Sequence, residues 1–278
     1  MNDQVSAPSV RLSGVEKAFP VKGGEPTVAL TGIDLEIADK EFVSLIGPSG
    51  CGKSTLLRVV GDLIQPSSGR VELNGKSAHQ ARLDREYGMV FQAPVLFDWR
   101  TVEANVRLPL EVTDYPKRER DALVREKLEL VELGGFLNHY PHQLSGGMQQ
   151  RVAIARALAL QPSLLLMDEP FGALDEMTRE RLNSELLDIW SETGTTVIFV
   201  THSIPEAVFL SSRVVVMSPR PGRIAETINI DLSYPRDEST REEDRYFDLV
   251  TGVREALRGR RSDGADLATR SRADRSFG

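Results

Sequence analysis

The sequence predicts an α/β fold built on a mostly parallel sheet, and three observations lead to this prediction. Two continuous apolar runs, residues 164–167 and 196–201, have the pattern of parallel strands buried on both faces. The segment between them, residues 175–192, has a helical pattern. A further apolar run, residues 41–47, ends at a glycine-rich segment that opens a helix. Strands that alternate with helices favour a parallel sheet covered by helices.

The elements on either side of the glycine-rich segment follow from the same kind of pattern. Residues 10–47 have the character of strands, and within them residues 28–37 alternate apolar and polar side chains. We expect an antiparallel β-subdomain at this N-terminal end of the core. Beyond the glycine-rich segment, apolar residues between 56 and 64 recur at helical spacing, and residues 69–75 have the pattern of a short strand.

The middle of the chain, from about residue 101 to residue 160, has a helical pattern. A charged helix is expected over residues 117–133 and an alanine-rich helix over residues 146–160. Because the buried strands resume only afterwards, we interpret residues 93–160, approximately, as a helical subdomain inserted into the core.

The domain boundaries follow from composition. One domain is expected over residues 10–257, with a short C-terminal appendage over about residues 219–257. Residues 1–9 are expected to form a flexible N-terminus. Residues 258–278 are rich in Arg, Ser, Asp and Gly and offer almost nothing to bury, so we expect a disordered tail.

Composition limits the classes of protein that the chain can represent. With 278 residues, 40% of them hydrophobic, it can build a sizeable core. The net charge of −7 gives no global positive field for nucleic acid or anionic lipid. No apolar stretch approaches the ~18 residues that span a bilayer, and the first residues lack the pattern of a signal peptide. We therefore expect a cytoplasmic chain that reaches a membrane only through a protein partner.

The glycine-rich segment, residues 47–54, has the sequence Gly-Pro-Ser-Gly-Cys-Gly-Lys-Ser and the spacing of a phosphate-binding loop. Its glycines let successive N–H groups turn inward, and the helix N-terminus adds positive potential. Lys53 is expected to reach the β- and γ-phosphates, and Ser54 to bind Mg²⁺. The nucleotide-binding residues predicted here are Gly47, Pro48, Ser49, Gly50, Cys51, Gly52, Lys53, Ser54 and Thr55. The alternative is a plain glycine-rich turn between a strand and a helix.

Two carboxylates follow the buried run at 164–167. Asp168 stands where a second Mg²⁺ ligand is expected in nucleotide hydrolases, and Glu169 is placed to polarise an attacking water. The alternative is an acidic helix start after a strand, because carboxylates suit helix N-termini.

A second candidate anion site lies at residues 144–151, Leu-Ser-Gly-Gly-Met-Gln-Gln-Arg. Ser145 is in a capping position, and the N–H groups of Gly146 and Gly147 follow at the start of the alanine-rich helix. Taken alone, the segment is a good helix N-cap.

These three motifs, in this order, resemble the signature set of ATP-binding-cassette (ABC) ATPases, and the resemblance covers about residues 10–218. It implies the ABC ATPase fold, a P-loop NTPase core with the antiparallel β-subdomain and the inserted helical subdomain, and it implies ATP and Mg²⁺ as ligands. In that family two cassettes pack head to tail. ATP on the Lys53 loop of one chain would then be capped by Ser145, Gly146 and Gly147 of a second copy in a homodimer.

The resemblance also implies roles for three residues outside these motifs. Gln92 is similar to the glutamine that links Mg²⁺ and the attacking water to the membrane partner, although it could be an ordinary surface residue. His202 resembles the switch histidine that contacts the γ-phosphate and orients Glu169. Asp175 resembles a residue that crosses the dimer interface, and it could also be a helix N-cap.

The adenine is expected to stack on Phe19, and Val28 could share this contact because the loop between them is longer than in many relatives. One departure follows the switch histidine: many relatives have Asp there, and this chain has Ser203.

Residues 214–224, 228–232 and 234–236 resemble the nitrate, sulfonate and taurine type of importer ATPases. That resemblance implies two transmembrane permease subunits, an extracytoplasmic substrate-binding protein reached through the permease, a peripheral location on the cytoplasmic face of the cell membrane, and no nucleic acid. The solute would be nitrate, a sulfonate, taurine or a pyrimidine-type vitamin precursor.

The alternatives are a soluble ABC-type ATPase that acts on nucleic acid or ribosomes, and a nucleotide-binding regulatory module without hydrolysis. The acidic balance argues against the first, and the intact motifs argue against the second. We also expect residues 95–100 to form part of the groove for the permease; alternatively, Leu96, Phe97 and Trp99 pack in the core of the subdomain.

Overall fold

The structure is a computed structural model that describes residues 9–113 and 115–259. The expected flexible N-terminus and disordered tail fall almost entirely on residues 1–8 and 260–278, outside the described residues. Ser9, Arg258 and Gly259 of these two segments are described. Ser9 is buried and its hydroxyl donates to Asn74 Oδ1 at 3.0 Å, and Arg258 is the C-cap of the last helix, so neither expectation holds for these two residues.

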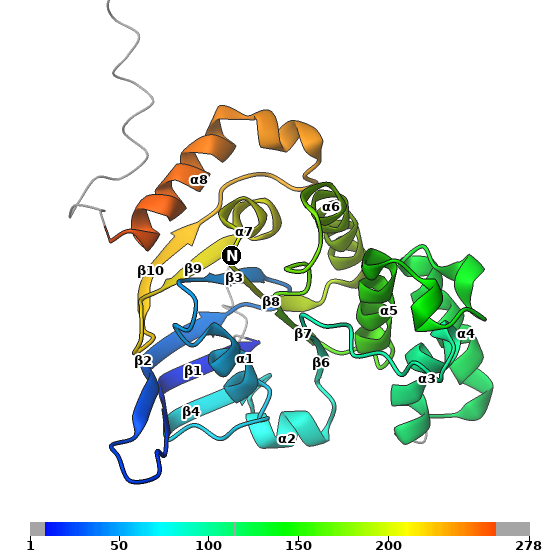
Figure 1. Ribbon diagram of the computed structural model, residues 1–278, viewed down its shortest axis with the longest axis horizontal. Coiled ribbons are helices and arrows are strands. Elements are labelled where there is room, and N and C mark those ends of the chain that lie inside the picture. Colours follow the sequence, from blue (N-terminus) through cyan, green and yellow to red (C-terminus); the bar gives the residue numbers. More distant parts are fainter. Residues whose placement is uncertain (1–8, 114, 260–278) are drawn as a thin grey trace, which may run out of the picture.

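Two sheets form the framework of the protein (Figure 1). The smaller is antiparallel, in the order β2-β1-β4-β5, with strands β1 (Val10–Phe19), β2 (Thr27–Ile37), β4 (Ser68–Leu73) and β5 (Lys76–Ser77). The larger has the order β10-β9-β3-β8-β7-β6, with β3 (Phe42–Ile46), β6 (Tyr87–Val90), β7 (Leu164–Asp168), β8 (Thr196–Thr201), β9 (Arg213–Met217) and β10 (Ile224–Asn229). Neighbouring strands of this sheet run parallel to each other, except that β10 runs antiparallel to β9.

The helices divide between the sheets and a separate group (Figure 1). They are α1 (Lys53–Val60), α2 (Ala78–Leu83), α3 (Val102–Val112), α4 (Lys117–Leu130), α5 (Gly146–Leu158), α6 (Glu176–Thr193), α7 (Ile204–Leu210) and α8 (Asp244–Leu257), with 3₁₀ turns at Gly134–Phe136, Pro141–Gln143 and Glu238–Glu242. Helices α3, α4 and α5 contact one another and gather beside the β6 edge of the larger sheet. The expected combination of a parallel core, an antiparallel β-subdomain and a helical subdomain is confirmed.

Both faces of the parallel sheet are buried, which explains its continuous apolar runs. On β3, Val43 and Leu45 pack with α1 and the antiparallel sheet, whereas Phe42 and Ile46 pack in the core that includes α6 and α7. The same alternation holds along β7, β8 and β9, because successive side chains of a strand point to opposite faces. Helix α1, which starts from the glycine-rich loop, is thereby fixed between the two sheets.

Two expected helices end earlier than the sequence pattern suggests. Helix α4 stops at Leu130 instead of residue 133, and α5 stops at Leu158 instead of residue 160. In both cases a nearby non-glycine residue adopts the left-handed backbone conformation, Glu132 with φ 57° and Gln161 with φ 51°. Such residues carry no helix-stop signal in the sequence, because glycine or asparagine normally occupies this conformation.

The C-terminal segment is built onto the core. Strand β10 extends the larger sheet, and α8 packs on α7 and β9. The buried guanidinium of Arg236 donates hydrogen bonds to the backbone oxygens of Val208, Phe209 and Ser211 at the end of α7, and to that of Leu232. It satisfies carbonyls that a helix end leaves without partners.

Candidate active site

The glycine-rich loop connects β3 to α1 at the carboxyl edge of the parallel sheet. Gly50 and Gly52 have φ values of 73° and 107°, a conformation that favours glycine. A Cβ on Gly52 would lie 2.7 Å from Leu30 Cδ2, and one on Gly47 would lie 2.8 Å from Cys51 Sγ. The tight curl expected of a phosphate-binding loop therefore depends on these glycines.

Lys53 is the first residue of α1, and its side chain is held against the loop. It is 6% exposed, and its Nζ donates to the carbonyl oxygens of Gly47 at 2.8 Å and Pro48 at 3.2 Å. The ammonium thus lies beside the loop whose N–H groups are expected to receive phosphate oxygens.

Ser54 and Asp168 meet across the site, since Ser54 Oγ donates to Asp168 Oδ1 over 2.7 Å. Asp168 ends β7 and is buried, so the two oxygens are fixed by α1 and the sheet. A hydroxyl and a carboxylate are hard oxygen donors, and Mg²⁺ in nucleotide sites is held by one or two such groups together with substrate phosphates. The pair fits the expected cation.

Glu169 and His202 form the second pair. They follow neighbouring strands, β7 and β8, and Glu169 Oε2 lies 3.1 Å from His202 Nδ1. Glu169 has φ 48°, and its N–H donates to Val200 O at 2.9 Å, which fixes its backbone. A non-glycine residue in this conformation is held by its surroundings, and such residues cluster at functional sites.

Gln92 follows β6, the strand beside β7, and its side chain lies near Glu169. A Cβ on Gly172 would lie 3.3 Å from Gln92 Nε2 and 3.6 Å from Glu169 Oε2. Gly172 is held to Glu169 by a backbone hydrogen bond of 3.0 Å. The amide of Gln92 and the carboxylate of Glu169 thus flank Gly172, and a larger residue there would crowd both.

The segment at residues 144–151 has the cap geometry that its sequence predicts. Ser145 is the N-cap of α5, and its Oγ accepts from the N–H of Met148 at 3.3 Å. Gly146 is exposed, whereas Gly147 is buried close to Thr178 at the start of α6. This segment of the chain therefore packs beside the residues that precede and open α6.

Asp175 is the N-cap of α6. Its carboxylate accepts from the N–H of Thr178 at 3.0 Å, and hydrogen bonds from Thr178 hold the pKa of Asp175 below its ordinary value. The helix-cap interpretation is confirmed, and the exposed position of Asp175 next to the Ser145 segment leaves it available to a second chain.

Phe19 and Val28 lie in adjacent positions of the β1–β2 pair, and both are partly exposed. Strand β2 passes directly beside the glycine-rich loop, since a Cβ on Gly52 would lie 3.1 Å from the backbone oxygen of Ala29. Lys17 Nζ lies 5.1 Å from the centre of the Phe19 ring. Both candidates for the adenine contact thus belong to the strand pair that borders the loop.

Gly222 is a residue of this region that the sequence analysis missed. Its backbone exchanges hydrogen bonds with β2 through Ala29 O and Thr31 N, and its Cβ position lies 2.1 Å from Cys51 O. Only glycine can approach the loop so closely. The signal in the sequence is the turn-forming Pro-Arg-Pro-Gly at residues 219–222, which connects β9 to β10.

Residues 95–100 form an exposed loop attached to α5. Arg156 donates to the backbone oxygens of Pro94 and Val95. Trp99 is 74% exposed, and its ring centre lies 5.0 Å from the ring centre of Phe97, whereas Leu96 packs against the core. The interpretation of all three apolar side chains as core residues is therefore wrong for Trp99.

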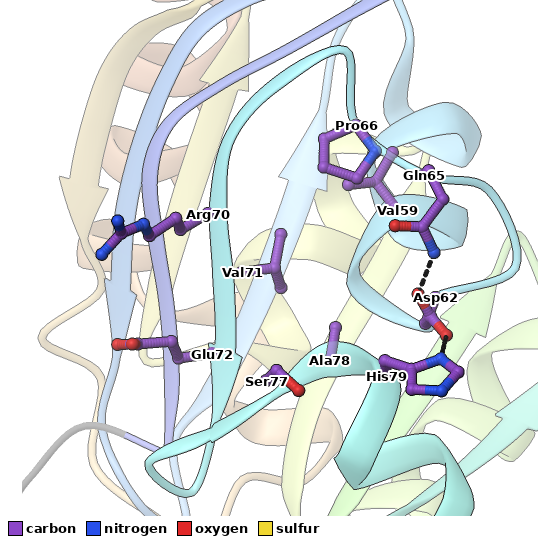
Figure 2. Close-up of a pocket in the computed structure, with 10 residues that line it drawn as sticks. All are labelled: Val59, Asp62, Gln65, Pro66, Arg70, Val71, Glu72, Ser77, Ala78 and His79. Carbon is purple, nitrogen blue, oxygen red and sulfur yellow. Dashed lines mark hydrogen bonds and ion pairs between the residues drawn. The ribbon is translucent and has the colours of Figure 1, made fainter.

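A cavity of about 260 Å³ lies outside the site, between α1, β4 and α2 (Figure 2). At its rim the Asp62 carboxylate contacts Gln65 and the His79 ring. None of its lining residues belongs to the predicted site.

The chain is similar to known ATP-binding proteins of transporters. The ABC transporter family profile matches residues 30–172. An uncharacterized ABC transporter ATP-binding protein of Methanocaldococcus jannaschii is 50% identical over 231 residues, 83% of this chain and 85% of that protein. The aliphatic sulfonates import ATP-binding protein SsuB of Bacillus subtilis is 47% identical over 232 residues, 84% of this chain and 89% of that protein. A dimeric cassette structure in a post-hydrolysis state, bound to ADP and Pi, matches with a TM-score of 0.70 and 37% identity over 81% of this chain and 100% of that one.

Proposed function

The chain belongs to the ABC transporter family, and on this premise we propose that it is the ATP-hydrolysing subunit of an importer for a small anionic solute. The similarity to an aliphatic sulfonates import protein makes sulfonates one candidate solute class. The solute itself would be bound by other subunits.

One observation carries the enzymatic part of the proposal: two functional pairs meet at the carboxyl edge of one parallel sheet. Ser54 contacts Asp168 at 2.7 Å, and Glu169 contacts His202 at 3.1 Å. Ligands of open α/β sheets bind at this edge. The pair that would bind the cation and phosphates therefore lies next to the pair that would activate the water.

In the proposed reaction, the N–H groups of residues 47–54 and the ammonium of Lys53 bind the phosphates of ATP. Ser54 and Asp168 would hold Mg²⁺, which when bound neutralises charge that develops on the β- and γ-phosphates. Glu169 accepts a hydrogen bond from the attacking water and polarises it. His202 contacts the γ-phosphate and keeps the Glu169 carboxylate in place.

Gln92 is proposed as a third member of this group. Its amide and the carboxylate of Glu169 flank Gly172, and Gln92 would contact the attacking water and the cation. Its segment is bonded to α5, because Gln150 Nε2 donates to Phe91 O at 3.1 Å. Movement of the helical subdomain would therefore reach the catalytic carboxylate through this segment.

Ser145, Gly146 and Gly147 are proposed to cap ATP bound to another copy of the chain. Two supports are the head-to-tail pairing that the family resemblance implies and the dimeric form of the similar cassette. Asp175, which caps α6 next to Gly147, would lie at the same interface. We propose a homodimer with two such composite sites.

The importer role requires membrane partners. Among the described helices, none is both long enough and apolar enough to cross a bilayer. We propose a peripheral position on the cytoplasmic face of the membrane, with two permease subunits contacting the loop that bears Trp99. A substrate-binding protein would act through the permease, and the net charge of −7 gives no support to a nucleic-acid partner.

The proposal is tested by uptake in cells of the source organism that lack this chain. Labelled taurine, an alkanesulfonate and nitrate are supplied as separate probes. Wild-type chain should restore uptake of at least one probe, Glu169→Gln should not, and the surface variant Glu192→Gln should restore it fully. Unchanged uptake of every probe in the deleted strain, together with ATPase activity stimulated by RNA or DNA, would favour the soluble alternative.

A further inference from the structure

A buried polar pair lies directly beneath the His202 segment. Thr201, the last residue of β8, is 2% exposed, and Glu206, in the first turn of α7, is 5% exposed. The Thr201 hydroxyl donates to Glu206 Oε2, and Thr201 Oγ1 accepts from the N–H of Ser203 at 2.9 Å. The pair thus ties together the two residues that flank His202 in the chain.

Helix α7, which carries Glu206, is held at both ends. Ser203 Oγ accepts from the N–H of Glu206 at 3.4 Å as the N-cap, and Tyr246 of α8 donates to Pro205 O at 3.1 Å. At the other end, Arg236 donates to three backbone oxygens. The position of Glu206 is therefore fixed, and its hydrogen bond with Thr201 can hold the His202 segment in place.

The buried residues around Glu206 include polar groups that an apolar core would not need. Glu206 Oε1, Asn183 Oδ1 and Arg179 Nε are buried without a hydrogen-bond partner among the described residues. Burial raises the pKa of Glu206, while the Thr201 hydroxyl and the charge of Arg179 act in the opposite direction. An apolar pair of the same size would avoid these desolvation costs, so a carboxyl group here points to a role beyond stability.

We propose that Glu206 is a positioning residue for ATP hydrolysis: through the Thr201 hydroxyl it fixes the backbone around His202 and so holds Nδ1 of His202 against Glu169. The inference rests on the proposed role of His202. It assigns no contact with substrate to either Glu206 or Thr201.

Two pairs of matched variants separate positioning from simple packing. Thr201→Ser keeps the hydroxyl, and Thr201→Val keeps the shape without it. Glu206→Gln keeps an oxygen that can accept a hydrogen bond from Thr201, and its amide N–H can donate to Asn183 Oδ1. Glu206→Leu keeps only the volume of the side chain.

We expect Thr201→Val and Glu206→Leu to lower kcat by roughly 10-fold or more, because small displacements of catalytic groups reduce rates by factors of this order. The KM for ATP should stay within about 2-fold of the wild-type value in both variants, because neither substitution removes a contact that binds ATP in the ground state. Thr201→Ser and Glu206→Gln should keep kcat near the wild-type value.

The imidazole of His202 gives an independent readout, since the chain has four histidines. The His202 ring resonances are assigned by comparison with His202→Ala, and they should shift in Thr201→Val but not in Thr201→Ser. If Thr201→Val folds poorly, the double variant Thr201→Val/Glu206→Leu, which buries no lone carboxyl group, takes its place.

The outcomes are distinct. Loss of activity in His202→Ala, with wild-type kcat and unshifted His202 resonances in Thr201→Val or its double variant, would overturn the positioning role alone. Full activity in His202→Ala would instead overturn the proposed role of His202 and the inference with it. Equal loss of kcat in Thr201→Ser and Thr201→Val would also contradict the inference, because the hydroxyl would not be the cause.

Discussion

Glu169 Oε2 lies 3.1 Å from His202 Nδ1, and each residue directly follows the end of one of two neighbouring parallel strands. The register of β7 and β8 sets this distance, because Asp168 pairs with Val200 and the chain leaves both strands at the same edge. The carboxylate that we propose to polarise water needs a fixed orientation, and its contact with the imidazole would supply it.

Replacing Glu169 by Gln should leave ATP binding intact and lower turnover by roughly 100-fold or more, since an amide cannot act as the base. ATP should then persist between the two cassettes, so size-exclusion chromatography with MgATP should show a stable dimer. The exposed substitution Glu192→Gln serves as the control and should turn over normally. Normal turnover in Glu169→Gln would remove this residue from its proposed role.

Replacing Lys53 by Ala should weaken nucleotide binding. We propose that the ammonium beside Gly47 and Pro48 contacts the phosphates, and charge-assisted hydrogen bonds of this kind contribute roughly 1.5–3 kcal/mol. Calorimetric titration with ADP should show a Kd raised by roughly 10- to 100-fold. Lys22→Ala, at an exposed position, should leave Kd unchanged; equal binding by both variants would contradict the role of Lys53.

A methyl group on Gly222 should disturb the phosphate loop from behind. Its Cβ would lie 2.1 Å from Cys51 O, so either the loop or the β9–β10 turn must move. We expect Gly222→Ala to lower the free energy of unfolding by about 1–3 kcal/mol and to weaken nucleotide binding. Gly135→Ala is the control, because its Cβ would meet nothing within 4 Å. Equal stability and affinity in the two variants would show that the close approach is unimportant.

Loss of Arg236 should destabilise the C-terminal segment. Arg236→Met leaves buried carbonyl oxygens of α7 without donors, which should cost about 3 kcal/mol of unfolding free energy in urea denaturation. The exposed pair of Arg245 with Asp231 provides the comparison, and Arg245→Met should cost less than about 1 kcal/mol. Equal losses in the two variants would contradict the capping role of Arg236.

The buried carboxyl group of Glu206 should make stability depend on pH. Burial raises its pKa in the folded protein above the ordinary value of 4.5, and the side chains of Thr201, Arg179, His202 and Asn183 act in the opposite direction. As pH rises past 4.5, the unfolded chain releases this proton first, so the free energy of unfolding falls until pH passes the folded-state pKa. Glu206→Gln lacks this titration. Its stability relative to wild type should increase with pH over this window in parallel urea denaturation series, and a constant or decreasing difference would contradict the assignment.

The strands of the core and the phosphate loop could be predicted because their signals are local. Continuous apolar runs on β7 and β8 follow from burial on both faces, and the loop glycines follow from backbone geometry at Gly50 and Gly52. Ser145 and Asp175 were predictable as caps, since a cap depends on residues three positions apart.

The remainder depends on contacts between distant segments. Gly222 meets Cys51 only after β9 and β3 have paired; the residues around Gly222 predict a turn, but they do not predict this contact. The Thr201–Glu206 pair is close in sequence, yet its burial depends on the packing of α7 against α6 and α8. The ends of α4 and α5 were expected later than they fall, because the left-handed conformations nearby belong to Glu132 and Gln161, residue types that carry no helix-stop signal.

We propose that ATP bound by Lys53 of one chain is hydrolysed only when Ser145 of a second chain covers it. The most direct measurement is the specific ATPase activity of the purified chain over a concentration range in which sedimentation velocity follows monomer and dimer in the same buffer. The activity per chain should rise with the dimer fraction and approach zero in the monomer, which should still bind nucleotide. A constant activity per chain across that range, with the protein monomeric at the low end, would contradict the claim.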